Sequence, residues 1–212
     1  ALEAVLSADN AIALASIAQG LKEPEKQRYA LNIGLLMAYV LRITLILTAT
    51  WIIKFWQFEL LGGLYLLWLT YRYFSENSHT EGEDEELSKL NFNNLWQTIP
   101  VIAFTDLAFS LDSVTTAIAV ADEIWLIIAG GTIGVIALRF LAGLFIRWIE
   151  EYTHLEDAGF ITVGLVGLRL ILKVVYPAIV PPEWLMISII IAMFTWGFSK
   201  KNEVTPSQSQ EG

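Results

Sequence analysis

The stretch Asp106-Leu-Ala-Phe-Ser-Leu-Asp112-Ser113 places two carboxylates inside an otherwise apolar run that extends from 99 to 121. A charged side chain in the middle of a bilayer costs at least ~2.5–3.5 kcal/mol on insertion scales, so a pair of them in one run needs a specific purpose. The chain begins with the same arrangement, Glu3-Ala-Val-Leu-Ser-Ala-Asp9-Asn10. A shift of 103 residues aligns the two stretches and pairs Glu3 with Asp106, Asp9 with Asp112 and Asn10 with Ser113. We interpret them as two copies of one motif that contribute to a shared site.

The composition around these motifs is that of a membrane protein. Of the 212 residues, 55% are hydrophobic and 17% are charged, whereas soluble proteins average roughly 45–50% and about 25%. Several apolar runs of about 17–25 residues are long enough to cross a ~30 Å hydrocarbon core. The alternating segments of about 10 residues that a transmembrane barrel requires are missing from the sequence. We therefore predict an all-α, polytopic membrane protein.

Apolar periodicity and helix stop signals predict seven transmembrane helices. Their expected ranges are 1–19, 29–53, 58–74, 95–121, 124–149, 158–176 and 183–199. The segments 20–24, 150–157 and 177–182 are predicted to be short connections. The segment 200–212 is polar, and we expect a disordered tail there.

Similarity between the two halves extends beyond the acidic motifs. Gly34 and Arg42 align with Gly131 and Arg139 at a shift of 97, and Gly63 aligns with Gly164 at a shift of 101. A repeat of three helices must insert in opposite orientations, so we predict an inverted 3+3 repeat with one extra helix. The expected divisions are 1–74 and 95–176 for the two halves, 75–94 for an acidic connecting loop, 177–199 for the seventh helix and 200–212 for the tail. The first motif has almost no apolar lead-in, so we expect further apolar residues upstream of Ala1 in the full-length protein.

The basic residues near the predicted helix ends indicate an orientation. One side holds Lys22, Lys26, Arg28, Arg72, Lys89, Arg147, Lys200 and Lys201, and the other holds little beyond Lys54. The positive-inside rule makes the basic side cytoplasmic, with the C-terminus and the acidic loop on that side. The loop carries Glu81, Glu83, Asp84, Glu85 and Glu86. We expect it to be a solvated connector or, alternatively, a surface that attracts cations or protein partners.

Carboxylates, an amide and hydroxyls make an oxygen-rich site that suits hard or borderline divalent cations. The candidate metal ligands are Glu3, Asp9, Asn10, Asp106, Asp112 and Ser113. On a regular helix Asp112 lies about 120° from the face shared by Asp106 and Ser113, so local unwinding would be needed to bring both carboxylates into one cavity. The alternative is a purely structural role, in which these carboxylates form ion pairs inside the bundle.

Arginines inside predicted helices are the candidate counter-charges for these carboxylates. They are Arg42, Arg139 and Arg169. Each can be a snorkelling or packing residue, or a cation that holds the empty site together until a metal ion displaces it. The sequence leaves both interpretations open.

The same sequence excludes several other functions. It contains no cysteine, which excludes thiolate metal sites and cysteine catalysis. The net charge of −9 argues against binding to nucleic acid. No nucleotide fingerprint in its strand–turn–helix context and no catalytic triad is present, so we do not expect an enzyme or a permanently bound cofactor.

The two motifs together resemble the paired signatures of the TerC family of integral membrane proteins. The resemblance covers 1–197, and the stretches 96–120 and 153–159 are especially similar to cyanobacterial and chloroplast thylakoid members. Members of that family are associated with manganese export, with tellurium resistance and, in plants, with thylakoid biogenesis and membrane-protein insertion. The incomplete start of the first helix is the one departure from the family pattern.

The resemblance and the acidic motifs together predict a transporter that exports a divalent cation from the cytoplasm. Mn²⁺ is the first candidate for the cargo and Ca²⁺ the second. The membrane would be a bacterial plasma membrane or a thylakoid. The alternative from a different class is a membrane-resident assembly factor that helps other proteins insert, with the acidic loop as its docking surface.

Overall fold

The computed structural model describes residues 7–21, 23–52, 54–78, 94–120 and 123–202. Apart from one isolated β-bridge between Tyr152 and Lys201, all regular structure in these ranges is helical, which confirms the all-α prediction. The helices are α2 (Ser7–Gln19), α3 (Pro24–Ile52), α4 (Trp56–Ser78), α5 (Leu95–Val120), α6 (Ile124–Glu151), α7 (Leu155–Val175) and α8 (Glu183–Gly197). A single 3₁₀ turn, η1 (Pro177–Ile179), lies between α7 and α8.

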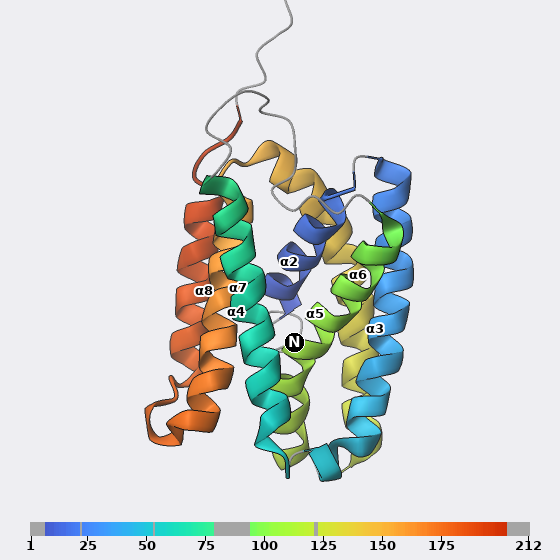
Figure 1. Cartoon of the computed structure of the whole chain (residues 1–212), viewed down its shortest axis with the longest axis vertical. Helices are drawn as coiled ribbons and strands as arrows, with labels where there is room; N and C mark the ends of the chain where they lie inside the picture. The colour runs from blue at the N-terminus through green and yellow to red at the C-terminus, as the bar shows by residue number, and fades with distance from the viewer. Residues whose placement is uncertain (1–6, 22, 53, 79–93, 121–122, 203–212) are drawn as a thin grey trace, which may run out of the picture.

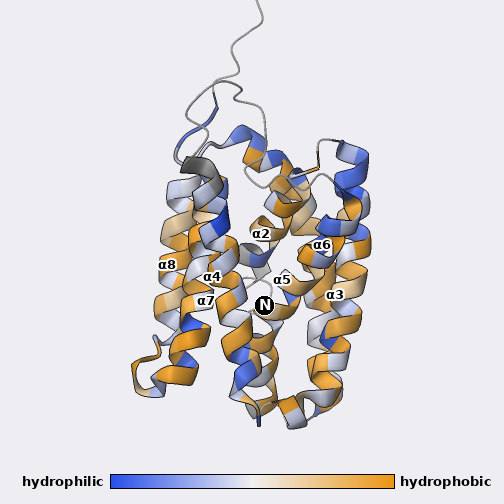
Figure 2. Cartoon of the chain, viewed as in Figure 1, coloured by the Kyte–Doolittle hydropathy of each residue, from blue (hydrophilic) through white to orange (hydrophobic). Residues whose placement is uncertain are grey.

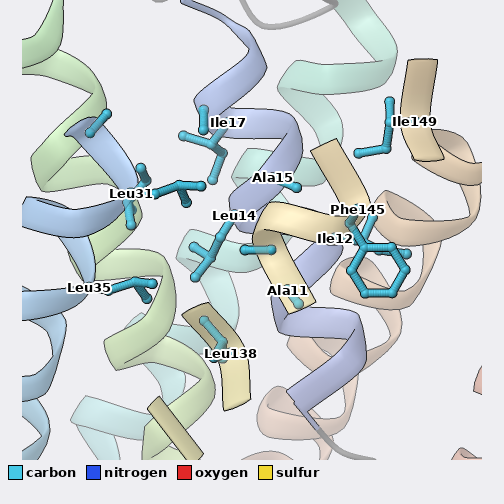
Figure 3. Close-up of a cluster of buried hydrophobic side chains, with 14 of the residues drawn as sticks. Ala11, Ile12, Leu14, Ala15, Ile17, Leu31, Leu35, Leu138, Phe145 and Ile149 are labelled. Atoms are coloured by element: carbon cyan, nitrogen blue, oxygen red, sulfur yellow. The ribbon is translucent and has the colours of Figure 1, made fainter. Parts of the chain in front are cut away.

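Helix α2 is the centre of the bundle, with α4 and α7 on one side of it and α3, α5 and α6 on the other (Figure 1). A helix that is apolar all round is expected to be buried on all sides, and from Asn10 to Leu21 nearly every residue of this segment is buried. Figure 3 shows Leu14 and Ile17 of α2 beside Leu31 of α3, and Ile12 beside Phe145 of α6. Small residues let the neighbours approach closely, because a Cβ on Gly159 would lie 2.0 Å from Ile12.

The packing pattern supports the predicted repeat. Helix α3 packs along α5 as α6 packs along α2, and α4 contacts α5 as α7 contacts α2. Three further pairs, α4 with α7, α3 with α6 and α2 with α5, join equivalent helices of the two halves. Helix α2 runs in the opposite direction to α5 (Figure 1). Exchanging the first three helices for the next three therefore leaves these pairings unchanged, as expected for two similar halves inserted in opposite directions.

The crossing of α4 and α7 shows why glycine is needed at the interface between the halves. A Cβ on Gly63 would lie 2.8 Å from the Gly167 carbonyl oxygen, and a Cβ on Gly167 would lie 3.0 Å from the Gly63 carbonyl oxygen. Any larger side chain would push the two backbones apart. Gly63 and Gly167 therefore allow the two helices to approach closely.

Within the described ranges, four helical segments are long and apolar enough to cross a membrane, judged by length and composition alone: Pro24–Ala49, Leu95–Ile118, Ile124–Glu151 and Leu155–Val175. Apolar residues dominate the lengths of the helices, while hydrophilic residues collect at the end of the bundle where α3 begins (Figure 2). Helix α4 is long but rich in tyrosine, tryptophan and polar residues, and α8 is only 15 residues long. Membrane crossing by α2, α4 and α8 remains a prediction.

Several predicted boundaries were wrong, and local contacts explain the differences. Helix α3 begins at Pro24 rather than 29, because proline is well suited to the first helical position. The predicted loop 150–157 shrinks to 152–154, since α6 continues to Glu151 and α7 starts at Leu155. Residues 75–78 of the predicted acidic loop belong to α4, and 79–93 lie outside the described residues.

The start of the predicted disordered tail is ordered. The Thr153 amide donates to the Lys200 carbonyl at 3.1 Å, and the Asn202 amide donates to the Glu151 carbonyl at 2.8 Å. Lys201 also pairs with Glu151 at 2.6 Å. Polar backbone groups between α6 and α7 therefore hold residues 200–202, and only 203–212 of the predicted tail lies outside the described residues.

Candidate functional site

Asp106 lies at the middle of α5 and is completely buried. Its carboxylate oxygens accept hydrogen bonds from Nη2 of Arg42 on α3 at 3.0 and 3.2 Å, and only 3% of the Arg42 side chain is exposed. Ser110 adds a hydroxyl that donates to the Asp106 carbonyl at 2.7 Å and lies 3.4 Å from a carboxylate oxygen. The two charges neutralise each other, which is the condition under which a carboxylate can stay buried in an apolar bundle.

The two motif helices pack against each other just after Asp106 along α5. Ala13 of α2 packs in one cluster with Ala108 and Phe109 of α5. Asp9 and Asn10 precede Ala13 by about one helical turn, and Asp106 precedes Phe109 by the same distance along the chain. Because α2 runs in the opposite direction to α5, Asp9 and Asn10 lie beside the residues that follow Phe109 rather than beside Asp106, so the two motifs approach each other around Ala13 and Phe109. Asn10 is 8% exposed; the Asp9 side chain and all of Glu3 lie outside the described part.

Asp112 occupies a second, different environment, because α5 is a continuous α-helix and its two carboxylates point to different neighbours. The Asp112 carboxylate pairs with Arg169 of α7 and accepts a hydrogen bond from Lys173 Nζ at 3.2 Å. The same Lys173 Nζ donates to Glu59 of α4 at 3.0 Å and to Thr115 at 3.1 Å. Within the described part of the chain, these two acids and two bases form a network across α4, α5 and α7.

This geometry does not show the shared cavity that the sequence-based hypothesis expected for the two carboxylates of α5. Without local unwinding in α5, Asp106 and Asp112 do not share one cavity in this conformation. Ser113 donates its hydroxyl to the Ser110 carbonyl at 3.3 Å and so bonds within its own helix. Among the described residues, no three acidic or histidine side chains lie close enough to hold one metal ion.

The arginines differ in their partners. Arg42 pairs with Asp106 and Arg169 pairs with Asp112, as a counter-charge would. Arg139 instead donates from Nε to the Asn32 side-chain oxygen, at the interface of α3 and α6. In the described structure it faces neither of the α5 carboxylates.

A third polar cluster joins α2, α4 and α7 near the basic end of the bundle. Ser16 donates to Glu156, which is only 7% exposed, and Tyr73 donates to Asp157 at 2.6 Å. The sequence suggested that Glu156 and Asp157 belong to a loop. They lie instead in the first turn of α7, where the positive end of the helix dipole stabilises acidic side chains.

Sequence reasoning missed the partners in this cluster and the central role of Lys173. Lys173 follows Arg169 by four residues and therefore shares a helix face with it. That spacing was the available signal for a basic face on α7.

Comparisons with known proteins agree with this architecture. The family model described as "Integral membrane protein TerC family" matches residues 1–204. The uncharacterized membrane protein YceF of Bacillus subtilis is 37% identical over 80% of this chain and 67% of its own length. The inner membrane protein YgdQ of Escherichia coli K12 is 32% identical over 81% of this chain and 77% of its own length.

A plant protein is also similar. The chloroplast thylakoid membrane protein TERC of Arabidopsis thaliana is 26% identical over 81% of this chain, which covers 52% of the plant protein. The chain thus spans between about half and three quarters of these relatives. No solved structure matches.

Proposed function

Because the chain belongs to the TerC family of integral membrane proteins, we propose that it is a multi-pass membrane transporter that carries a divalent metal cation out of the cytoplasm. Mn²⁺ is the first candidate for the cargo, and Ca²⁺ is the second. The single observation that carries the proposal is the fully buried Asp106 carboxylate, clamped by Arg42 where the two motif helices cross.

Ionisable residues inside membrane-spanning helices mark ion pathways more often than structural sites, because burying them is costly. The Asp106–Arg42 pair is already neutral, so a divalent cation must displace the guanidinium to reach the carboxylate. The liberated charge would have to find another position, which couples cation binding to a change in how α3 packs along α5. In this proposal Arg42 keeps the unloaded site closed.

The first motif supplies the remaining ligands in this proposal. Asn10 contributes an amide oxygen from α2, and Glu3 and Asp9 contribute carboxylates from the same motif. Oxygen ligands of this kind suit Mn²⁺, Ca²⁺ and Mg²⁺. Asp112, with Ser113 beside it, would act as a second station nearer the opposite end of the bundle, where Arg169 and Lys173 hold it until the cation arrives.

The basic end of the bundle supports the proposed orientation. Lys26, Arg28, Arg147 and Lys200 lie where α3 begins and where α6 and α8 end. The positive-inside rule places this end and the C-terminus in the cytoplasm of a bacterial plasma membrane or on the equivalent side of a thylakoid. The chain has no cysteine, so a single cysteine introduced at Lys200 can be tested for labelling from either side.

The deciding experiment measures uptake of Mn²⁺, Ca²⁺, Mg²⁺ and Zn²⁺ into sealed proteoliposomes. Asp106→Asn keeps the size of the side chain and removes its charge, and we expect Mn²⁺ flux to fall to the protein-free background. Glu123→Gln is the control, because it removes one exposed acidic charge at a helix end. Equal flux for wild type and Asp106→Asn would refute the proposed site.

A further inference from the structure

A groove of about 610 Å³ lies between the start of α3 and the last part of α6, away from both ion pairs. Three arginines and one glutamate line it: Arg28 on α3, and Arg139, Arg147 and Glu150 on α6. Its charged lining is therefore net positive by two. It is placed at the end of the bundle where α3 begins and α6 ends, and where hydrophilic residues collect (Figure 2). In a membrane we expect this end to lie at the level of the lipid headgroups.

The arginines of the groove are available to an anion. In the described part of the chain, Arg28 and Arg147 are exposed and form no hydrogen bond or ion pair. Arg139, Gly143 and Arg147 follow one another at four-residue steps, so they share one face of α6. A Cβ on Gly143 would lie 3.3 Å from Arg139 Nη1, so the glycine leaves room for the guanidinium. Arg139 itself is oriented by Asn32.

The rest of the groove is apolar and opens onto the outside of the bundle. Leu31, Phe140 and Leu144 line it, and Phe140 is 75% exposed. Further from the basic end, Ile136 and Ile133 continue an exposed apolar strip along α6 at three- and four-residue steps. A ligand that fits both parts has an anionic phosphate at one end and a hydrocarbon chain at the other.

We propose that this groove binds an anionic phospholipid, with its phosphate among Arg28, Arg139 and Arg147 and one acyl chain along Phe140, Ile136 and Ile133. Basic pockets between transmembrane helices commonly bind anionic headgroups. The start of α3 adds its positive helix dipole, since Pro24 and Gln27 also line the groove. The bound lipid fastens α3 to α6. This inference is independent of the cargo and of the proposed transport.

The test uses the full chain, delipidated in a neutral detergent, and measures lipid binding by native mass spectrometry. Phosphatidylglycerol is compared with phosphatidylcholine of the same acyl chains and with inorganic phosphate. We expect phosphatidylglycerol to bind at least about tenfold more tightly than phosphatidylcholine. Each basic residue near an anionic lipid contributes roughly a fivefold change, so Arg28→Gln with Arg147→Gln should weaken binding about 25-fold.

Lys200→Gln is the matched control, because it removes one exposed positive charge at the same end of the bundle but outside the groove. It should leave phosphatidylglycerol binding unchanged. Equal binding of the two lipids, an unchanged affinity in the double variant, or an equal loss in the control would overturn the proposal. If inorganic phosphate at millimolar concentration displaces the lipid completely, the groove is a phosphate-ion site and the lipid assignment is wrong.

A second measurement needs no variant. Phosphatidylglycerol with a photoreactive group in its acyl chain should label the α6 strip from Ile133 to Leu144 in the wild-type protein. Labelling no stronger than that from the phosphatidylcholine analogue would contradict the assignment. Because Mn²⁺ flux is not the readout, failure here and failure of the transport proposal are distinguishable.

Discussion

Asp106 and Asp112 belong to one motif on one helix, yet they lie in different physical environments. Asp106 is completely buried and pairs with a single arginine from α3. The Asp112 side chain is 13% exposed and shares a network with Arg169, Lys173 and Glu59, in which Lys173 is 31% exposed. Six residues of helix turn the two carboxylates about 120° apart and move them about 9 Å along the axis.

The difference separates two kinds of charged site. Asp106 is completely buried, so loss of Arg42 removes a counter-charge from a carboxylate that water cannot reach. At Asp112 several partly hydrated groups can compensate for one another. We therefore expect the first site to respond strongly to a change of charge and the second to respond weakly.

The largest effect is expected for Arg42→Gln, which leaves the buried Asp106 carboxylate without this arginine. Removal of one member of a buried ion pair costs about 3–5 kcal/mol. The free energy of unfolding, measured by denaturant titration in detergent micelles, should fall by that amount.

The control for this prediction is the double variant Arg42→Gln with Asp106→Asn. It replaces both charges with neutral amides, so most of the lost stability should return while Mn²⁺ flux remains at background. A double variant as unstable as Arg42→Gln alone would mean that the cost does not arise from an isolated charge.

A smaller effect is expected for Asp112→Asn. The substitution weakens the hydrogen bonds that Arg169 and Lys173 donate to the Asp112 carboxylate. A hydrogen bond to a charged group contributes about 1.5–3 kcal/mol to stability. Lys173 keeps its contact with Glu59. The same titration should show a loss at or below the lower end of that range. A loss as large as that of Arg42→Gln would remove the distinction between the two sites.

Salt should affect the two sites differently. Exposed charges are screened within about 8–10 Å at 0.1–0.15 M salt, whereas fully buried pairs are screened much less. The destabilisation caused by Lys173→Met, about 1 kcal/mol or less for a partly exposed pair, should shrink between 0.05 and 0.5 M NaCl. The effect of Arg42→Gln should stay constant over the same range.

The smallest effect is expected for Tyr65→Phe. The Tyr65 hydroxyl on α4 lies 3.0 Å from Thr105 Oγ1, next to Asp106 in the chain. Hydrogen bonds between membrane helices average about 0.6 kcal/mol, so stability should fall by roughly that amount. Thr48→Val, which removes a hydroxyl that bonds within α3, gives the reference for a bond inside one helix.

Much of the fold was predictable from local patterns. Long apolar runs located the helices, and the repeated acidic motif indicated two halves that the packing of α3 on α5 and of α6 on α2 supports. Segments at helix ends were less predictable, because they depend on contacts with distant parts of the chain, such as the hydrogen bonds that join Lys200 to Thr153 and Asn202 to Glu151.

The candidate site was predictable in its residue types but only partly in its partners. Asp106, Asp112, Arg42 and Arg169 were identified as charged residues inside apolar helices, and they form two ion pairs. Arg139 aligns with Arg42 in the repeat, yet it faces the groove between α3 and α6. Helical spacing indicates which residues share a face of one helix and does not indicate which helix that face meets.

The sequence by itself determined the class of the protein, because twenty-residue apolar runs can satisfy their backbone hydrogen bonds in a bilayer only as helices. It also determined that carboxylates and arginines lie within those helices. The tertiary structure decided that Asp106 and Asp112 face different arginines, because the rotation of each helix is set by packing between residues as distant in sequence as Gly63 and Gly167. It also decided that Arg28 and Arg147, on helices far apart in the chain, line one groove.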